Sequence, residues 1–219
     1  MPVLSEREIK ARLRLPPWNP KSLVITPQFQ EVDTFDADSV DLRLGTHFLL
    51  PRVTQQPFFS PERRAASGFH EGVHVPLGQY LVVPAHQTVL GATLEFIKLP
   101  HDISGEILTK SSIARMFIVI ETAPWIHPEY RGCLTLEIAN VSNTPTLIYP
   151  GRTIGQLVLM QVKNPEAPRN DRRLDATYFG PVQPESPVFK NPQDDLKLIG
   201  IDRTWIMRPP RRVRGKLYK

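Results

Sequence analysis

Short apolar runs, separated by prolines and other turn residues, dominate the pattern of this chain. Val, Ile, Leu, Thr and aromatic residues gather in these runs, and some alternate with small or polar positions, as in CLTLEIA at 133–139. The 23 prolines stand mostly at the boundaries of the runs, and proline cannot occupy a central position in a β-ladder. Short, regularly spaced strands with turns between them predict an all-β sandwich or barrel. The predicted strands are 46–50, 79–83, 88–99, 105–108, 117–122, 133–141, 146–149 and 154–162.

A helix is predicted only near the start of the chain, over residues 4–14. Ser5 is a suitable N-cap, and Ile9 and Leu13 fall on one face of such a helix. Pro16 and Pro17 follow after Leu15 and end it, because proline cannot continue the helical hydrogen bonds.

Outside these elements the chain is polar and rich in proline and glycine. We expect long loops over 51–74 and 163–195, and one further strand over the apolar run 196–201. The length of 219 residues fits one domain with an extension. We therefore expect a single β domain over 1–184 and a C-terminal extension over 185–219.

The net charge of +5 comes from the end of the chain. Residues 203–219 hold seven Lys and Arg residues and no acid, whereas the rest of the chain holds 20 basic and 22 acidic residues. Nucleic-acid-binding proteins usually carry their positive charge as a stripe or groove across the fold. The distribution therefore favours a solvated tail, with contact to nucleic acid or to an acidic partner as the alternative.

The cysteine count and the hydropathy of the chain indicate the cellular compartment. Cys133 is the only cysteine, so neither an intramolecular disulfide nor a Cys-rich zinc site can form. The first residues are charged and lack the apolar centre of a secretory signal, and no apolar run approaches the length of a membrane span. We therefore expect a cytoplasmic protein with no membrane contact.

A run of hydroxyl and cationic residues, TKSSIAR at 109–115, follows one of the predicted strands. Lys110 and Arg115 supply two positive charges, and an arginine can grip a phosphate with two hydrogen bonds. Ser111 and Ser112 add hydroxyl donors, and backbone N–H groups in a turn that opens a short helix also face an anion. The segment is a candidate phosphate site; a solvated turn is the alternative.

Glu137 stands inside an apolar predicted strand, where a carboxylate is unfavourable unless it has a partner or a chemical task. General acid/base catalysis is one such task. The alternative is a carboxylate on the wet face of the strand, because the positions two residues away are Thr135 and Ala139. Two further segments flank this strand, the aromatic hairpin TAPWIHPEYRG at 122–132 and the turn YPGRTIGQL at 149–157.

The order of these segments resembles the dCTP deaminase family within the dUTPase superfamily. KSSIAR is followed by TAPWIHPEYRG, then by LTLEIAN, then by PGRTIGQL, and the flanking segments 4–9, 37–45 and 89–100 agree. The resemblance extends from about residue 4 to about residue 180. It implies a distorted jelly-roll β-barrel and a homotrimer whose active sites are shared between subunits. It also implies dCTP or dUTP as the ligand, bound as a triphosphate with Mg²⁺.

The resemblance implies a zinc-independent chemistry as well. In deaminases of this family a water attacks C4 of cytosine, a glutamate shuttles protons and ammonia leaves. Zinc deaminases need His-x-Glu followed by Cys-x-x-Cys, and a single cysteine cannot supply the second part. Transferred position by position, the resemblance makes Glu137 the general acid/base, with Ser111 and Arg115 positioning the water and the base. The implied substrate contacts are Lys110, Ser112, Ala123, Trp125, His127, Tyr178 and Gln183.

Three departures from the family pattern keep other functions open. His127 stands where the family usually has an aspartate, which in dUTPases orients the water that attacks the α-phosphate. Pro124 and Trp125 are nearer to the Gly-Trp of deaminases that also hydrolyse dUTP, and the closing segment 176–184 is poor in glutamine. We expect deamination of dCTP to dUTP. The alternatives are dUTP hydrolysis, alone or after deamination, and non-catalytic nucleotide binding.

Overall fold

The computed structural model describes residues 2–29, 38–52, 69–120, 123–165 and 180–187. Over these residues the protein is mainly β, with helix α1 (Glu6–Leu13) near the start and the short helix α2 (Ser111–Ala114) in the middle. The strands are β1 (Val24–Thr26), β2 (Ser39–Arg43), β3 (His47–Pro51), β4 (His70–His74), β5 (Leu81–Val83), β6 (Thr88–Lys98), β7 (Ile103–Thr109), β8 (Ile118–Ile120), β9 (Trp125–Ile126), β10 (Arg131–Asn140), β11 (Thr146–Ile148) and β12 (Thr153–Gln161).

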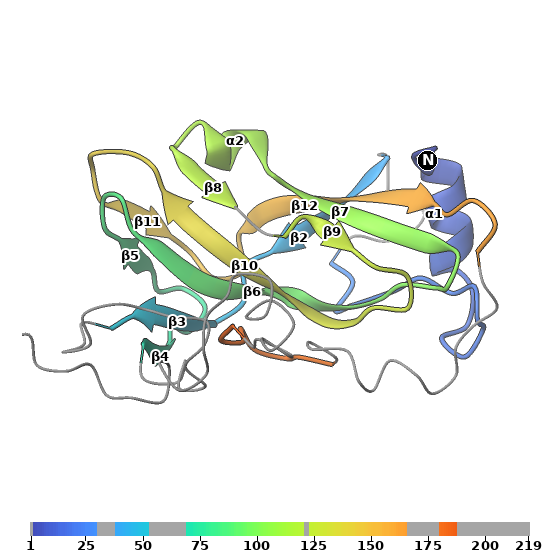
Figure 1. Ribbon diagram of the computed structural model, residues 1–219, viewed down its shortest axis with the longest axis horizontal. Coiled ribbons are helices and arrows are strands. Elements are labelled where there is room, and N and C mark those ends of the chain that lie inside the picture. Colours follow the sequence, from blue (N-terminus) through green and yellow to red (C-terminus); the bar gives the residue numbers. More distant parts are fainter. Residues whose placement is uncertain (1, 30–37, 53–68, 121–122, 166–179, 188–219) are drawn as a thin grey trace, which may run out of the picture.

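The strands form two larger sheets and one small one. The first has the order β4-β3-β6-β10-β8, with β1 also paired to β6, and the second has the order β2-β12-β7-β9. Strands β5 and β11 form the small sheet. In Figure 1 this small sheet and α2 lie at one end of the molecule, and α1 lies at the other. The pairings are antiparallel throughout the described residues, and all except β3–β4 join strands that are not consecutive in sequence.

Alternate residues of the long strands build the hydrophobic core. On β10, Leu136 and Ile138 are completely buried, whereas Thr135 and Glu137 point to the opposite face of the sheet and are half-buried. This is the alternation that the sequence predicts for a strand with one face on a core. Each of the eight predicted strands is observed, with ends that differ by at most two residues. The predicted helix is observed as α1.

Helix α1 begins with a capping arrangement. The backbone N–H and the hydroxyl of Ser5 both donate to the carboxylate of Glu8, at 2.8 and 2.7 Å. These hydrogen bonds lower the pKa of Glu8. Ile9 points inward and is fully buried, so the helix is attached to the core by its apolar face.

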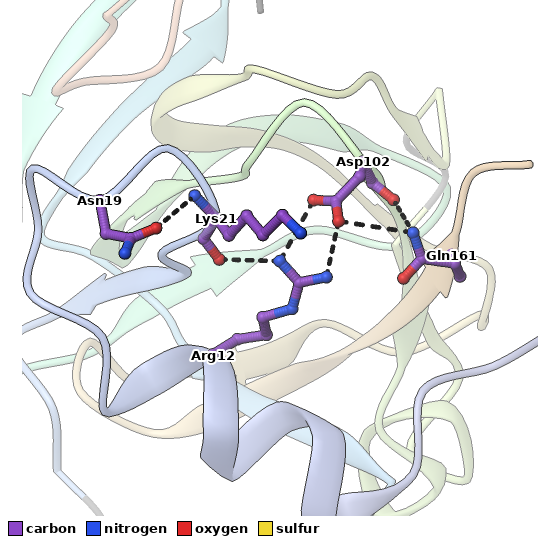
Figure 2. A network of polar contacts seen from close by, with 5 residues as sticks. All are labelled: Arg12, Asn19, Lys21, Asp102 and Gln161. Atoms are coloured by element: carbon purple, nitrogen blue, oxygen red, sulfur yellow. Dashed lines mark hydrogen bonds and ion pairs between the residues drawn. The ribbon is translucent and has the colours of Figure 1, made fainter. Parts of the chain in front are cut away.

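A polar network fixes the other end of α1 (Figure 2). The Arg12 guanidinium donates to both oxygens of the Asp102 carboxylate, at 2.6 and 3.3 Å, and to the carbonyl oxygen of Lys21 at 3.0 Å. Gln161, at the end of β12, donates to the backbone oxygen of Asp102 at 2.9 Å. Burial raises the pKa of Asp102, but the hydrogen bonds and charge of Arg12 outweigh it, so the pKa is lowered overall. The network joins α1 to the start of β7.

Strand β4 corrects one prediction. A loop was expected over 51–74, but His70–His74 form a strand that pairs with His47–Pro51 of β3. HEGVH is polar and contains a glycine, so its own β-propensity is low, and the pairing with β3 creates the strand. The predicted strand over 196–201 lies outside the described residues.

Candidate active site

The phosphate-binding candidate is a tight turn between β7 and α2. The backbone N–H of Lys110 donates to the carbonyl oxygen of Ile154 on β12 at 3.0 Å, which fixes the start of the turn. Thr109 accepts a hydrogen bond from the N–H of Ile120 at 2.9 Å through its hydroxyl, which links the turn to β8. The sequence expectation of a turn or short helix here is confirmed. Ser111, Ser112 and Arg115 are exposed on it.

The side chain of Lys110 is held by an acid that sequence reasoning did not single out as a site residue. Its Nζ donates to Asp41 Oδ1 at 2.5 Å. Asp41 lies on β2, directly opposite Gln156 of β12, which in turn lies opposite Leu108 of β7. The register therefore places Asp41 beside the phosphate-binding candidate although 69 positions separate it from Lys110 in sequence. The only sign of Asp41 in the sequence was its place between Val40 and Leu42, on the polar side of the alternating segment SVDLR.

Glu137 lies on β10 of the other sheet. It shares the face opposite to the core with Thr135 and is only half-buried, yet its Oε2 atom is buried. The neighbouring strand β8 pairs Ile120 with Ile138, next to Glu137, and β8 directly follows α2 in the chain. Glu137 thus lies on the side of the strand that faces away from the core, as the alternative interpretation expected. Part of its carboxylate is nevertheless shielded from solvent. Such shielding favours a carboxylate with a defined task.

The sequence predicts a hairpin over 122–132, but the described residues of this aromatic segment do not form one: β9 pairs with β7 of the four-stranded sheet, whereas β10 belongs to the six-stranded sheet. The N–H of Ile107 donates to the carbonyl oxygen of Pro124 at 3.1 Å, and β9 then pairs with β7 through Trp125 and Glu106. Ile126 is buried, so the side chains on either side of it, Trp125 and His127, are the exposed ones. Ala123 is exposed too. The segment therefore presents the predicted substrate contacts to solvent at a defined place beside β7.

Tyr130 lies in the connection from β9 to β10. Its hydroxyl donates to the carbonyl oxygen of Cys133 at 2.8 Å. Burial, with smaller contributions from Cys133 and Glu185, raises the pKa of Tyr130, so the phenol stays protonated and keeps donating. The connection from β9 to β10 is therefore held by a hydrogen bond from a protonated phenol.

Residues 180–187 run along β10 (Figure 1). Gly180 N–H donates to the carbonyl oxygen of Arg131 at 2.8 Å, and the carbonyl oxygen of Pro181 accepts from Cys133 N–H at 2.7 Å. Further along, the N–H of Glu185 donates to the hydroxyl of Thr135 at 3.3 Å. Gln183 lies between these contacts in sequence and is exposed. Tyr178 lies outside the described residues.

A cleft of about 200 Å³ opens beside α2. Its wall is largely apolar, and its polar groups come from α2 and from the turn that leads into β12. Apolar walls with a few convergent polar groups are typical of small-molecule sites. The polar and amphipathic lining residues are Ser112, Tyr149, Arg152 and Thr153.

Within the described part of the chain, no group of three or more His, Cys, Asp or Glu side chains is placed to hold a metal ion. No described helix is both long and apolar enough to cross a membrane. The donors at the phosphate-binding candidate are an ammonium, a guanidinium and hydroxyls, which suit phosphate oxygens.

Comparison with known proteins identifies the family. The family model for dCTP deaminase-like proteins matches residues 3–162. A relative from Methanobrevibacter smithii, named dCTP deaminase, dUMP-forming, is 29% identical over 193 residues, which cover 87% of this chain and 96% of the relative. A relative of the same name from Methanoregula boonei is 34% identical over 177 residues, covering 80% of this chain and 88% of the relative.

A solved structure agrees at the level of the fold. The 2'-deoxycytidine 5'-triphosphate deaminase from Agrobacterium tumefaciens superposes with a TM-score of 0.53 at 24% identity, over 74% of this chain and 46% of that chain. The fold is therefore the mainly β fold of the dUTPase-like superfamily. Within that superfamily, the chain belongs to the dCTP deaminase family, and the resemblance found in the sequence is confirmed.

Proposed function

We propose that this protein is a dCTP deaminase of pyrimidine deoxynucleotide metabolism. In the proposed reaction water adds to C4 of the cytosine ring, the C4–N bond breaks, and dUTP and ammonia are released. The observation that carries the proposal is Glu137. In a chain of this family, Glu137 lies on the face of β10 opposite to the core, and one oxygen of its carboxylate is shielded from solvent.

One carboxylate can serve both proton transfers of this reaction. Glu137 accepts a proton from the attacking water and later delivers one to the leaving amine, because the same oxygen can act as base and then as acid. Ser111 and Arg115, exposed on α2 and directly after it, position the water and the base. This assignment needs no metal-activated water.

The triphosphate contacts are proposed at the turn before α2. Lys110 and Ser112 bind phosphate oxygens, and Mg²⁺, entering with the nucleotide, neutralises part of the phosphate charge when bound. The turn supplies an ammonium and hydroxyl groups, which bind phosphate oxygens. The Mg²⁺ is therefore expected to arrive already bound to the nucleotide. The base and sugar contacts are the backbone of Ala123 and the side chains of Trp125 and His127, and the closing contacts are Tyr178 and Gln183.

The assembly is part of the same proposal. We propose a homotrimer in which Glu137 and the α2 residues of one active site come from different subunits. Ser111, Ser112 and Arg115 are exposed, and Met116 and Phe117, directly after Arg115, are exposed apolar side chains that a neighbouring subunit would cover. The cytoplasmic location expected from the sequence belongs to this proposal too.

Continued hydrolysis to dUMP is the second candidate function. The names of the relatives favour it, since those proteins are called dUMP-forming. Trp125 also matches the pattern of deaminases that hydrolyse dUTP. His127 argues against it, because an imidazole lacks the permanent negative charge with which an aspartate orients the attacking water.

Product analysis separates these functions. Purified protein is incubated with dCTP and Mg²⁺, and nucleotides and ammonia are followed over time by chromatography and a coupled assay. We expect ammonia and dUTP in equal amounts. Accumulation of dUMP with pyrophosphate would support the second candidate. Binding of dCTP without either product would leave only the non-catalytic alternative.

A further inference from the structure

Asp41 is the only acid among the described residues that forms an ion pair with the phosphate-binding candidate. Its Oδ1 accepts a hydrogen bond from Lys110 Nζ at 2.5 Å. Both side chains are about one-third exposed, 38% for Asp41 and 33% for Lys110, so a ligand can still reach the ammonium. Among the described residues, Lys110 is the one hydrogen-bond partner of the Asp41 side chain.

The backbone around both groups is fixed. Asp41 lies inside the β2–β12 ladder opposite Gln156, and the Lys110 N–H is bonded to Ile154 of the same strand β12. A lysine side chain carries its ammonium on a flexible four-carbon chain and loses much conformational freedom when it binds a ligand. An acid on a rigid strand reduces that loss, because it holds the ammonium near its binding position before the ligand arrives.

Arg43, the charged residue nearest to Asp41 on β2, is already paired with another acid. Arg43, two residues further along β2, has its own partner, since its Nη1 and its backbone N–H both donate to the Glu95 carboxylate, at 3.2 and 2.8 Å. Glu95 is buried, and its burial raises its pKa while Arg43 opposes that shift. The pair Arg43–Glu95 is therefore balanced by itself. Among the described residues, Asp41 therefore has Lys110 as its partner.

We propose that Asp41 is a positioning residue that holds Lys110 in place to bind the terminal phosphates of the nucleotide. An ammonium has three N–H donors. One of them binds Asp41 and two remain for phosphate oxygens, so the acid orients the lysine without occupying it. This inference rests on the proposed nucleotide site, but the positioning itself requires only an anion with several phosphate groups.

The positioning role and simple charge repulsion predict opposite changes in anion affinity when the charge of Asp41 is removed. A negative charge beside a phosphate site weakens anion binding by Coulomb repulsion, so removal of that charge should tighten binding. A positioning acid has the reverse effect, because its removal releases the lysine. Asp41→Asn keeps the size of the side chain and removes its charge. Inorganic tripolyphosphate is a probe that reports binding without any need for turnover.

The experiment measures tripolyphosphate binding by calorimetry for the wild type, Asp41→Asn, Lys110→Met and the double variant. We expect Asp41→Asn to weaken binding about two- to fivefold, which is the range of a partly exposed ion pair. In the Lys110→Met background the same change should have no further effect, since a residue that acts through Lys110 is silent without it. Asp41→Glu should restore part of the affinity, and the exposed Asp38→Asn is the matched control.

Kinetics with dCTP give the second readout. Asp41→Asn should raise KM by a similar factor with a smaller change in kcat, because the residue orders a binding group and takes no part in proton transfer. Tighter tripolyphosphate binding in Asp41→Asn, or equal weakening with and without Lys110, overturns the proposal. Absence of tripolyphosphate binding to the wild type overturns it as well. A wild type that shows the expected binding pattern but no turnover refutes the deaminase proposal and leaves the role of Asp41 standing.

Discussion

The proposed chemistry depends first on a single carboxylate. Glu137→Gln keeps the shape and hydrogen-bonding reach of the side chain but cannot accept a proton. We expect dCTP affinity within a few-fold of the wild type and a fall in kcat of about 10²–10⁴, the usual contribution of a positioned acid/base. Binding is measured by calorimetry and turnover by release of ammonia. Glu71→Gln, on the exposed edge strand β4, is the control and should change neither quantity. Full activity in Glu137→Gln would remove Glu137 from the mechanism.

His127 decides between the two hydrolytic outcomes. The residue is exposed beside the buried Ile126, so an aspartate fits there without repacking the core. His127→Asp supplies a permanent negative charge where the family usually has one, and we expect it to raise hydrolysis of dUTP while deamination is retained. The release of pyrophosphate from dUTP measures the change. If the wild type is inactive and His127→Asp gains deamination, the natural protein is a nucleotide-binding module.

At the scale of single residues, the sequence predicted those site residues that strand alternation and residue identity can reveal. Glu137 stood out because a carboxylate in an apolar strand is unusual, and its placement opposite the core followed from the period of the strand. Asp41 could not be recognised as a partner of Lys110 in the same way. Their contact depends on the register of β2, β12 and β7, which no local pattern fixes.

Among the elements, α1 offers a test of the network in Figure 2. Arg12 and Asp102 are mostly buried, at 17% and 7% exposure, so Arg12→Met should lower the free energy of unfolding by about 1–3 kcal/mol at pH 7. Arg7→Met on the same helix is the control, because Arg7 is exposed, and this change should cost about 0.5 kcal/mol or less. Urea denaturation measures both changes. An equal loss in the two variants would contradict the special role of Arg12.

The same network makes stability depend on pH. The pKa of Asp102 is lowered in the folded protein, so its contribution is fully present above the unfolded-state value of about 3.9 and is lost as the pH falls through the folded value. The stability difference between the wild type and Arg12→Met should therefore shrink below about pH 4. A difference that stays constant from pH 7 to pH 3 would show that packing, and not the charge on Asp102, accounts for the loss.

Elements were predicted well where their sequence carries the signal. Strands β6, β10 and β12 are long and apolar, and each was found within two residues of its ends. Strand β4 was missed because HEGVH has no strand pattern of its own and is formed by pairing with β3. The short strands β1 and β9 have three and two residues, which is too few for a period to appear. Long-range pairing therefore decides what local sequence leaves open.

For the whole molecule, the order of the segments identified the family although no single segment was specific. The proposed assembly can be tested directly. Three chains of 24.9 kDa should give a particle of about 75 kDa by light scattering at micromolar concentration. The exposed Met116 and Phe117, directly after Arg115, are apolar surface that a neighbouring subunit would cover. A monomer would remove the basis for active sites shared between subunits.

Mixed trimers test the sharing itself. If one active site takes Glu137 from one subunit and Arg115 from the next, then Glu137→Gln and Arg115→Met chains, each inactive alone, should complement each other. With equal amounts and random assembly, about one site in four combines an intact Glu137 with an intact Arg115, so coexpression should restore about a quarter of wild-type turnover. Mixing after purification should restore less, because trimers must first exchange subunits. If coexpressed chains form mixed trimers yet show no more activity than either variant alone, both residues serve the same subunit's site, and the pairing of β8 with β10 brings them together within one chain.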